Sequence, residues 1–142
     1  MTTVTVPQNY KPTEKETYMN PVMLEFFRHK LLAWKAEIVR EADITLQDLQ
    51  DDGGMQEPDI TDRASAETEV ALELRTRDRQ RKLISKIDEA LERIERNEYG
   101  YCEETGEPIG IKRLEARPIA TLTVEAQERH ERKERTQRDE RE

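Results

Sequence analysis

The sequence predicts a mainly α fold, in which a long antiparallel coiled-coil hairpin precedes a small zinc-finger-like, metal-free module and a C-terminal helix. Of the 142 residues, 34% are hydrophobic and 39% are charged. That is too little apolar material for a compact globule of this length, but it suits helices that each bury one stripe. Two segments with helical periodicity predict the two helices of the hairpin. Two pairs of positions spaced like the ligands of a zinc site predict the small module. We expect a flexible segment over 1–18, a hairpin over 19–97 with its tip at about 51–63, the module over 98–126, and a charged helix over 127–142.

The first helix is predicted to begin at Asn20-Pro21, where an N-cap residue is followed by a proline suited to the first helical position. From there apolar residues recur at steps of three or four, which indicates one apolar seam along a helix. The seam residues are Leu24, Phe27, Leu31, Trp34, Ile38, Ala42, Leu46 and Leu49.

A turn interrupts the periodicity at residues 50–58, which contain Gly53, Gly54 and Pro58. Thr61 or Asp62 can then cap a second helix that reaches about Asn97. Its predicted seam comprises Val70, Leu74, Ile84, Ile87, Leu91 and Ile94. Two helices of roughly thirty residues would pair as an antiparallel coiled coil about 45 Å long.

Basic residues occupy the middle of the second helix, and Arg77 and Arg81 fall where the seam would pass. Their aliphatic stems can cover the partner helix while the guanidinium groups reach solvent. A sharper interpretation is a basic patch that docks on an acidic protein surface. That patch would contain Arg75, Arg77, Arg79, Arg81 and Lys82.

Two pairs of positions late in the chain have the spacing of a four-cysteine zinc site, with Cys102 and Thr105 in the first pair and Thr123 and Ala126 in the second. Three of the four positions lack a thiol. One thiolate cannot supply the ~10 kcal/mol or more that a full zinc site contributes to folding. We therefore predict no zinc, packing by side chains, and a Cys102 that behaves as a small buried hydrophobe, with acidic neighbours expected to raise its pKa.

The charge balance bears on partners and location. The net charge of −8 disfavours nucleic-acid phosphates as the main partner and favours a protein. No run of eighteen apolar residues and no basic, then apolar, N-terminal pattern is present, so we expect a cytoplasmic protein. The single cysteine fits a reducing compartment.

Residues 99–118, which read YGYCEETGEPIGIKRLEARP, resemble the C-terminal module of the DksA/TraR family of RNA polymerase-binding transcription factors. The resemblance extends back through 74–84 to 59–64, and forward to about Ala126. It implies a non-enzymatic regulator, a monomer that enters the secondary channel of RNA polymerase on its β′ side without binding specific DNA sequences. It also makes Arg79 a candidate for polymerase docking.

The hairpin tip is the second element of the resemblance. Asp59, Asp62 and Ala64 match the Asp-x2-Asp-x-Ala tip of DksA-like factors, which the hairpin brings near the polymerase active centre. Aspartates at turns and N-caps also stabilise backbone amides, and composition alone favours that role. A further alternative is magnesium chelation by Asp51, Asp52, Asp59 and Asp62, as in Gre-type transcript-cleavage factors.

The resemblance also implies a response to the alarmone ppGpp. Leu83, Lys86 and Arg117 fall on family positions implicated in its binding, although a surface lysine and a bracing arginine are ordinary in any protein. A further basic family position is Gln127 here, so we expect a weaker response. The predicted function is modulation of open-complex stability at rRNA and stringent-response promoters. A Gre-like elongation factor and a purely structural coiled-coil protein remain alternatives.

Overall fold

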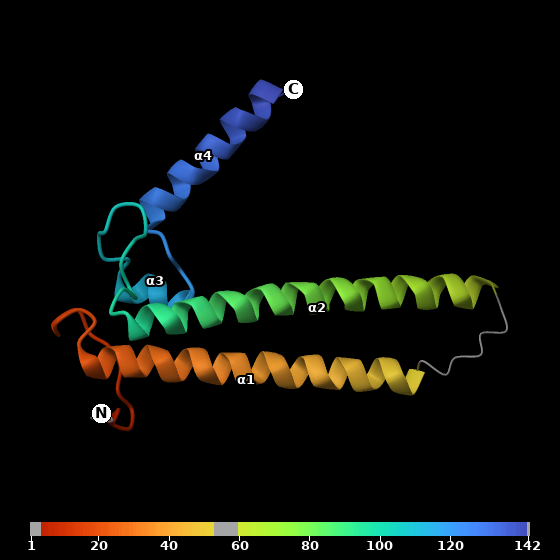
Figure 1. Cartoon of the computed structure of the whole chain (residues 1–142), viewed down its shortest axis with the longest axis horizontal. Coiled ribbons are helices and arrows are strands. Elements are labelled where there is room, and N and C mark those ends of the chain that lie inside the picture. Colours follow the sequence, from red (N-terminus) through yellow and green to blue (C-terminus); the bar gives the residue numbers. More distant parts are fainter. Residues whose placement is uncertain (1–3, 53–59, 142) are drawn as a thin grey trace. The chain divides into compact units, whose positions relative to one another are not determined.

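The computed structural model describes residues 4–52 and 60–141, and the described residues form four helices (Figure 1). These are α1 (Pro21–Asp52), α2 (Ile60–Glu95), α3 (Ile111–Ala116) and α4 (Val124–Arg141). The chain divides into two units, one of Met1–Leu31 with Ala90–Glu142 and the other of Leu32–Glu89, so that α1 and α2 each contribute to both. Within the described residues, no helix is long and apolar enough to cross a membrane.

The second unit consists of the later part of α1 and the earlier part of α2, which run antiparallel (Figure 1). Lys35 Nζ lies 2.7 Å from Asp88 Oδ1 and joins the two helices. Ile38 and Ile87 are buried where the helices meet. Every third or fourth residue of α2 is at least half-buried, which is the spacing of a coiled-coil seam. These α2 positions are Ala66, Val70, Glu73, Arg77, Gln80, Ile84 and Ile87.

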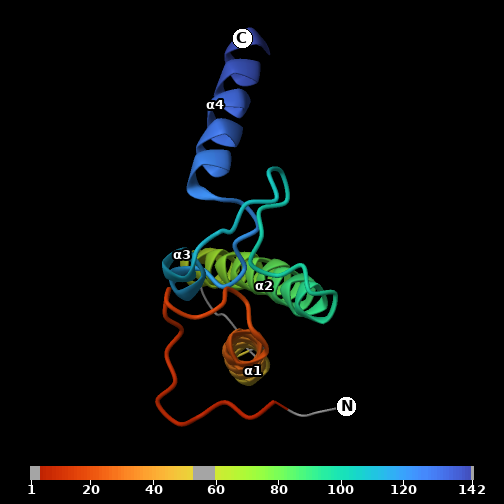
Figure 2. The ribbon, with the colours of Figure 1, turned by 90° about the vertical axis from the view of Figure 1, so that its left-hand side faces the viewer.

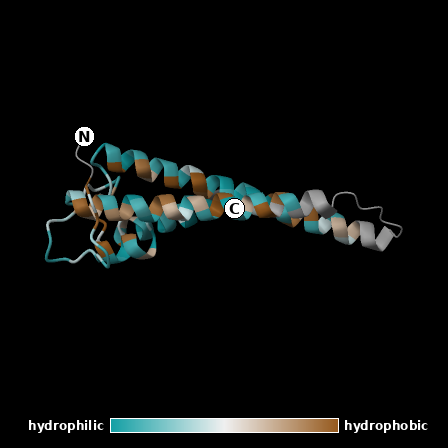
Figure 3. Ribbon diagram, turned by 90° about the horizontal axis from the view of Figure 1, so that it is seen from below, coloured by the Kyte–Doolittle hydropathy of each residue, from teal (hydrophilic) through white to brown (hydrophobic). Residues whose placement is uncertain are grey.

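The middle of this seam is more polar than the sequence predicted. Glu73, Arg77 and Gln80 occupy three successive inward positions, whereas Leu74 is 49% exposed and Arg81 faces solvent. The prediction that Leu74 and Arg81 lie on the seam was therefore wrong, because counting apolar residues skipped a polar stretch that keeps the same spacing. Leu46 of α1 is likewise exposed. Figure 3 shows hydrophilic residues interspersed with hydrophobic ones along both helices.

The first unit begins with residues 4–20, which form turns and no helix. Tyr10 donates from its hydroxyl to Glu16, and its ring packs edge-on against Phe26 with 5.8 Å between ring centroids. Figure 2 looks along α1 and shows this segment curving around the start of the helix. The predicted cap is confirmed, because the N–H of Met23, two positions after Pro21, donates to Asn20 Oδ1 at 2.9 Å.

The start of α1 packs against the module that follows α2, and both belong to the first unit. The rings of Phe27 and Tyr99, which are 0% and 1% exposed, have centroids 5.6 Å apart. Tyr18 reaches the same module, since its hydroxyl donates to the Gly100 carbonyl and accepts from the Gly110 N–H. This docking buries apolar surface that a segment of some thirty residues could not bury alone.

Several features of the C-terminal region differ from expectation. The short α3 was not predicted; it buries Ile111 and Leu114, and Lys30 Nζ of α1 donates to the Glu115 carbonyl at its end. The final helix begins at Val124, three residues before the predicted start. Among the described side chains of α4, three pairs of opposite charge at i,i+4 form no ion pair. Those pairs were Glu128/Arg132, Glu131/Arg135 and Glu134/Arg138.

Candidate functional site

The knuckle module starts where α2 ends. Asn97 adopts φ 60°, a left-handed conformation that asparagine tolerates better than most residues. The N–H groups of Glu98 and Tyr99 then both donate to the Arg93 carbonyl, which satisfies an acceptor at the helix terminus. This reversal turns the chain back into the module and places the buried Tyr99 against α1.

A tight loop carries the first knuckle. The Cys102 N–H donates to the Glu107 carbonyl, the Ile109 N–H donates to the Gly100 carbonyl, and Tyr101 and Pro108 form an isolated antiparallel bridge. Gly100 has φ 92°, and a Cβ there would lie 2.9 Å from Cγ of Met19, so the loop requires glycine at this position. The two sides of this turn thus pair up to Ile109, beyond which Ile111 enters α3.

Hydrogen bonds connect the four knuckle positions. Thr123 lies directly before α4, and its Oγ1 accepts from the Ala126 N–H at 3.2 Å, as an N-cap side chain does. The same hydroxyl donates to Cys102 Sγ at 3.9 Å. Cys102, Thr123 and Ala126 are 3%, 5% and 0% exposed, whereas Thr105 lies at the surface and accepts from the Glu107 N–H. Side-chain packing and capping therefore connect the two knuckles.

The ionisation of Cys102 differs from the expectation. Burial raises the pKa of its thiol, but hydrogen bonds from the Thr105 side chain and from the backbone N–H groups of Thr123, Thr105 and Glu104 outweigh burial and lower the pKa to about 7. The expectation that acidic neighbours raise this pKa was wrong, because the nearby N–H groups, which a sequence does not reveal, dominate. Cys102 also borders a pocket of about 420 Å³ with Arg93 and Tyr101.

Zinc does not fit the donor set of this module. Tetrahedral zinc needs four ligands, and the four positions offer one thiol, two hydroxyls and a methyl group. The Thr123 hydroxyl is already engaged with Cys102 and Ala126. No cluster of three or more potential ligands (His, Cys, Asp or Glu) occurs in the part of the chain that the structure describes.

The candidate residues outside the module lie on several elements. Arg79 and Lys86 are exposed on α2, and Leu83, one turn before Lys86, is half-buried. Arg117 is exposed directly after α3, where its N–H donates to the Arg113 carbonyl. The exposed cations are accessible to an acidic or phosphorylated partner.

The predicted tip falls mostly outside the described residues. Asp59 is not among them, and Asp62 belongs to α2 but its side chain is not described. Ala64 is exposed in the first turns of α2, which begins at Ile60, ahead of the predicted caps Thr61 and Asp62. The role of these three residues stays a prediction.

Two contacts that sequence reasoning missed hold the module in place. Arg93 is only 13% exposed at its side chain, and it donates to the Tyr101 carbonyl while lying 3.7 Å from Glu103. His130 of α4 pairs with Glu104 of the first knuckle. Both pairings join residues eight or more positions apart, so helical periodicity gave no signal for them.

An antiparallel helix pair followed by a compact knuckle module defines a class of helical-hairpin proteins with a zinc-finger-like domain. Comparison with known proteins specifies the class further. Residues 23–94 match the family described as the N-terminal domain of DnaK suppressor protein DksA, and residues 97–132 match the prokaryotic dksA/traR C4-type zinc finger. The chain therefore belongs to the DksA family, whose members are regulators and not enzymes.

Individual relatives agree with this assignment. The chain is 64% identical over 123 residues to the RNA polymerase-binding transcription factor DksA of Caulobacter vibrioides, a match that covers 87% of this chain and 86% of the relative. It is 46% identical to the protein of that name from Escherichia coli, over 85% of this chain and 78% of the relative. Transcription factor DksA2 from Pseudomonas aeruginosa has a similar structure, with a TM-score of 0.76 at 45% identity over 83% of this chain and 90% of that one. The predicted family and fold class are confirmed.

Proposed function

We propose that this chain binds RNA polymerase through its secondary channel, on the β′ side, and modulates the stability of promoter open complexes. The observation that carries the proposal is the 64% identity, over 87% of the chain, to a relative named for binding RNA polymerase. The match includes both the hairpin and the module, so it is not confined to one shared motif. We expect the chain to act as a cytoplasmic monomer on rRNA and stringent-response promoters.

In the proposed mechanism, the middle of the hairpin and its tip have different roles. Arg79 and its basic neighbours dock on an acidic surface of the polymerase, because exposed guanidinium groups steer and orient protein partners. Asp59 and Asp62, with Ala64 beside them, then act near the active centre. They shift the equilibrium between closed and open promoter complexes, so promoters with short-lived open complexes respond most.

We further propose that ppGpp modulates this activity through Leu83, Lys86 and Arg117. The support is the exposure of the two cations, which leaves them free to contact phosphates. Gln127 carries no charge at a position where the family supplies a cation, so the response is weaker than that of a relative with a basic residue there.

The central test separates docking from tip action. The double variant D59N/D62N should bind polymerase with nearly the affinity of the unmodified chain, measured by pull-down or fluorescence anisotropy. It should no longer shorten the lifetime of open complexes at an rRNA promoter. D51N/D52N, which also removes two charges beside the turn, serves as the matched control and should regulate normally.

Two results would contradict the proposal. Loss of polymerase binding in D59N/D62N would assign the acids to docking and not to regulation. Magnesium-dependent cleavage of nascent RNA in stalled complexes would instead identify a transcript-cleavage factor.

A further inference from the structure

A pocket of about 480 Å³ lies between α4 and the first knuckle, beside the Glu104–His130 pair. It is bordered by Glu104 from the knuckle loop and by residues from the first half of α4. All of these residues belong to the first unit of the chain. The α4 residues are Arg129, His130, Arg132, Lys133 and Thr136.

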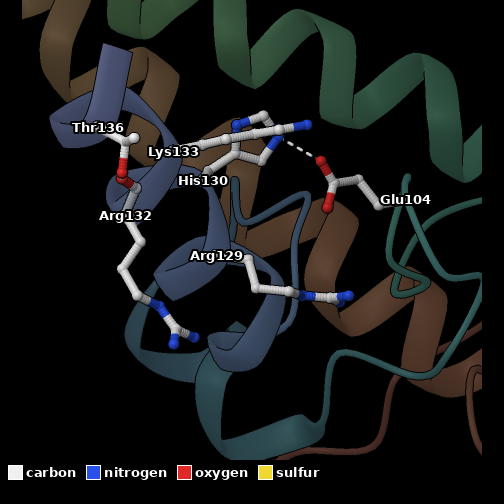
Figure 4. A pocket seen from close by; sticks show the side chains of 6 residues that line it. All are labelled: Glu104, Arg129, His130, Arg132, Lys133 and Thr136. Carbon is white, nitrogen blue, oxygen red and sulfur yellow. Dashed lines mark hydrogen bonds and ion pairs between the residues drawn. The ribbon is translucent and has the colours of Figure 1, made fainter. Parts of the chain in front are cut away.

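The charge of this pocket contrasts with that of the whole chain. Three permanent cations and a histidine border it, and Glu104 is its one carboxylate, although the chain carries a net charge of −8. Figure 4 shows the Arg129 and Lys133 side chains extending from α4 on the side that faces Glu104, while Arg132 points away from Glu104.

Helical spacing accounts for this concentration. Arg129, Lys133 and Thr136 follow one another at steps of four and three, so they share a face of α4. The acids of the same stretch, Glu128, Glu131 and Glu134, lie on the other side of the helix with Arg135 and Arg138. The helix therefore places Arg129 and Lys133 together on the face that borders the pocket, and Glu125, four residues before Arg129, is the acid of α4 on that face.

The chemistry of the lining fits a phosphate group. Guanidinium groups present paired donors that match phosphate oxygens, and the Lys133 ammonium adds a point charge. Among the described residues that border the pocket there is no phenylalanine, tyrosine or tryptophan, and the His130 imidazole is the one aromatic ring. A volume within the ordinary range of small-molecule sites suits a compact ligand better than a duplex.

We propose that this pocket binds the diphosphate group of a small phosphorylated molecule through Arg129 and Lys133. His130 and Glu104 border the site and pair with each other, which joins α4 to the knuckle loop. The site contains none of Leu83, Lys86 and Arg117, and the proposal does not depend on polymerase binding.

The Glu104 carboxylate provides a second way to test the proposal. Glu104 places a negative charge on the wall of an anion site, and its side chain is 40% exposed, so it is accessible to the ligand. Replacing it with glutamine removes that repulsion while keeping a polar side chain of the same size. E104Q should therefore bind diphosphate more tightly.

The test uses the full-length chain without polymerase and sodium pyrophosphate as the probe, with binding followed by calorimetry at low salt. The unmodified chain should show one saturable site. R129Q/K133Q should weaken binding by about tenfold or more, because charge-assisted hydrogen bonds to phosphate are lost. Circular dichroism confirms that the helices remain, since both side chains are on the surface.

R135Q/R138Q is the matched control, because it removes two cations from the same helix on the side turned away from the pocket. It should change the affinity by less than about twofold, as expected for screened charges outside a site.

Three outcomes would overturn the proposal. The first is no saturable binding of pyrophosphate to the unmodified chain. The second is equal weakening in R129Q/K133Q and R135Q/R138Q, which would reveal a general charge effect. The third is binding of a DNA duplex through Arg129 and Lys133 that pyrophosphate does not compete with, which would identify a nucleic-acid contact.

Discussion

At the scale of single residues, Cys102 is the one of the four knuckle positions that keeps a thiol. Hydrogen bonds from Thr105 and from neighbouring N–H groups overcome the effect of burial and lower the pKa of its thiol from 9.0 to about 7. We expect the ultraviolet absorbance of the thiolate to rise with pH around a midpoint near 7 in the folded chain. T105V should move this midpoint upward, since it removes the largest single contribution that lowers the pKa.

The same shift makes stability depend on pH. Because the folded pKa lies below the unfolded one, the thiolate stabilises the fold fully above pH 9.0, and this contribution is lost as the pH falls through about 7. T136V is the control for T105V and should leave the titration midpoint of Cys102 unchanged. In the described structure, Thr136 bonds only to the Arg132 carbonyl of its own helix. A midpoint that is unchanged in T105V would show that backbone donors alone set the pKa.

At the scale of elements, the polar middle of the helix pair limits its stability. Gln80 Oε1 and Glu73 Oε2 are buried without a hydrogen-bond partner among the described residues, although both side chains face the seam. A buried acceptor without a partner costs about 1–3 kcal/mol. Q80L should therefore stabilise the helix pair by about 1 kcal/mol, because it removes the unpaired oxygen and extends the apolar stretch that begins at Ile84.

Trp34 offers a local measurement of this change. It is the one tryptophan of the chain and lies half-buried on α1 in the same unit, so its fluorescence during urea unfolding reports on the helix pair. K82L, on the exposed side of α2, is the control and should bring no gain. Equal midpoints for Q80L and the unmodified chain would mean that the Gln80 amide finds a partner in solution.

The elements also show what could be predicted from sequence. Periodicity and capping rules located α1 and its start, because Asn20, Pro21 and the apolar steps act within a few residues. They failed at Glu73, Arg77 and Gln80, since a seam set by two pairing helices continues through polar residues that a count of apolar side chains skips. They also missed α3, whose six residues bury Ile111 and Leu114 and depend on contacts with distant segments.

In the candidate site, too, some features could be predicted from the sequence and others could not. The loss of three zinc ligands is visible in the sequence, but the hydrogen bonds from Thr123 to Cys102 and from Ala126 to Thr123 exist only once the two knuckles fold together. The cationic pocket on α4 requires both the helical register of Arg129 and Lys133 and the position of Glu104, twenty-five or more residues earlier. The role of a residue could therefore be predicted where it depends on neighbours in the sequence. It could not be predicted where tertiary folding brings distant residues together.

At the scale of the whole molecule, the proposed ppGpp response should be limited by one missing cation. Gln127 is half-buried on α4, and its Nε2 donates to Glu131 Oε1 at 3.3 Å. Q127K would supply the charge, but the same carboxylate would neutralise much of it as an i,i+4 partner. We therefore expect Q127K alone to raise the effect of ppGpp on an rRNA promoter only slightly, and Q127K/E131Q to raise it more, by about tenfold in the ppGpp concentration needed.

In vitro transcription across a ppGpp titration measures this response with the chain in complex with polymerase. E131Q alone is the control for removing a negative charge, and R135K is the control for a conservative change on the same helix. If Q127K/E131Q and E131Q shift the titration equally, the gain comes from lost repulsion and the added ammonium makes no contact. If neither variant shifts it, ppGpp does not bind near residue 127, and the assignment of this position by family resemblance is wrong.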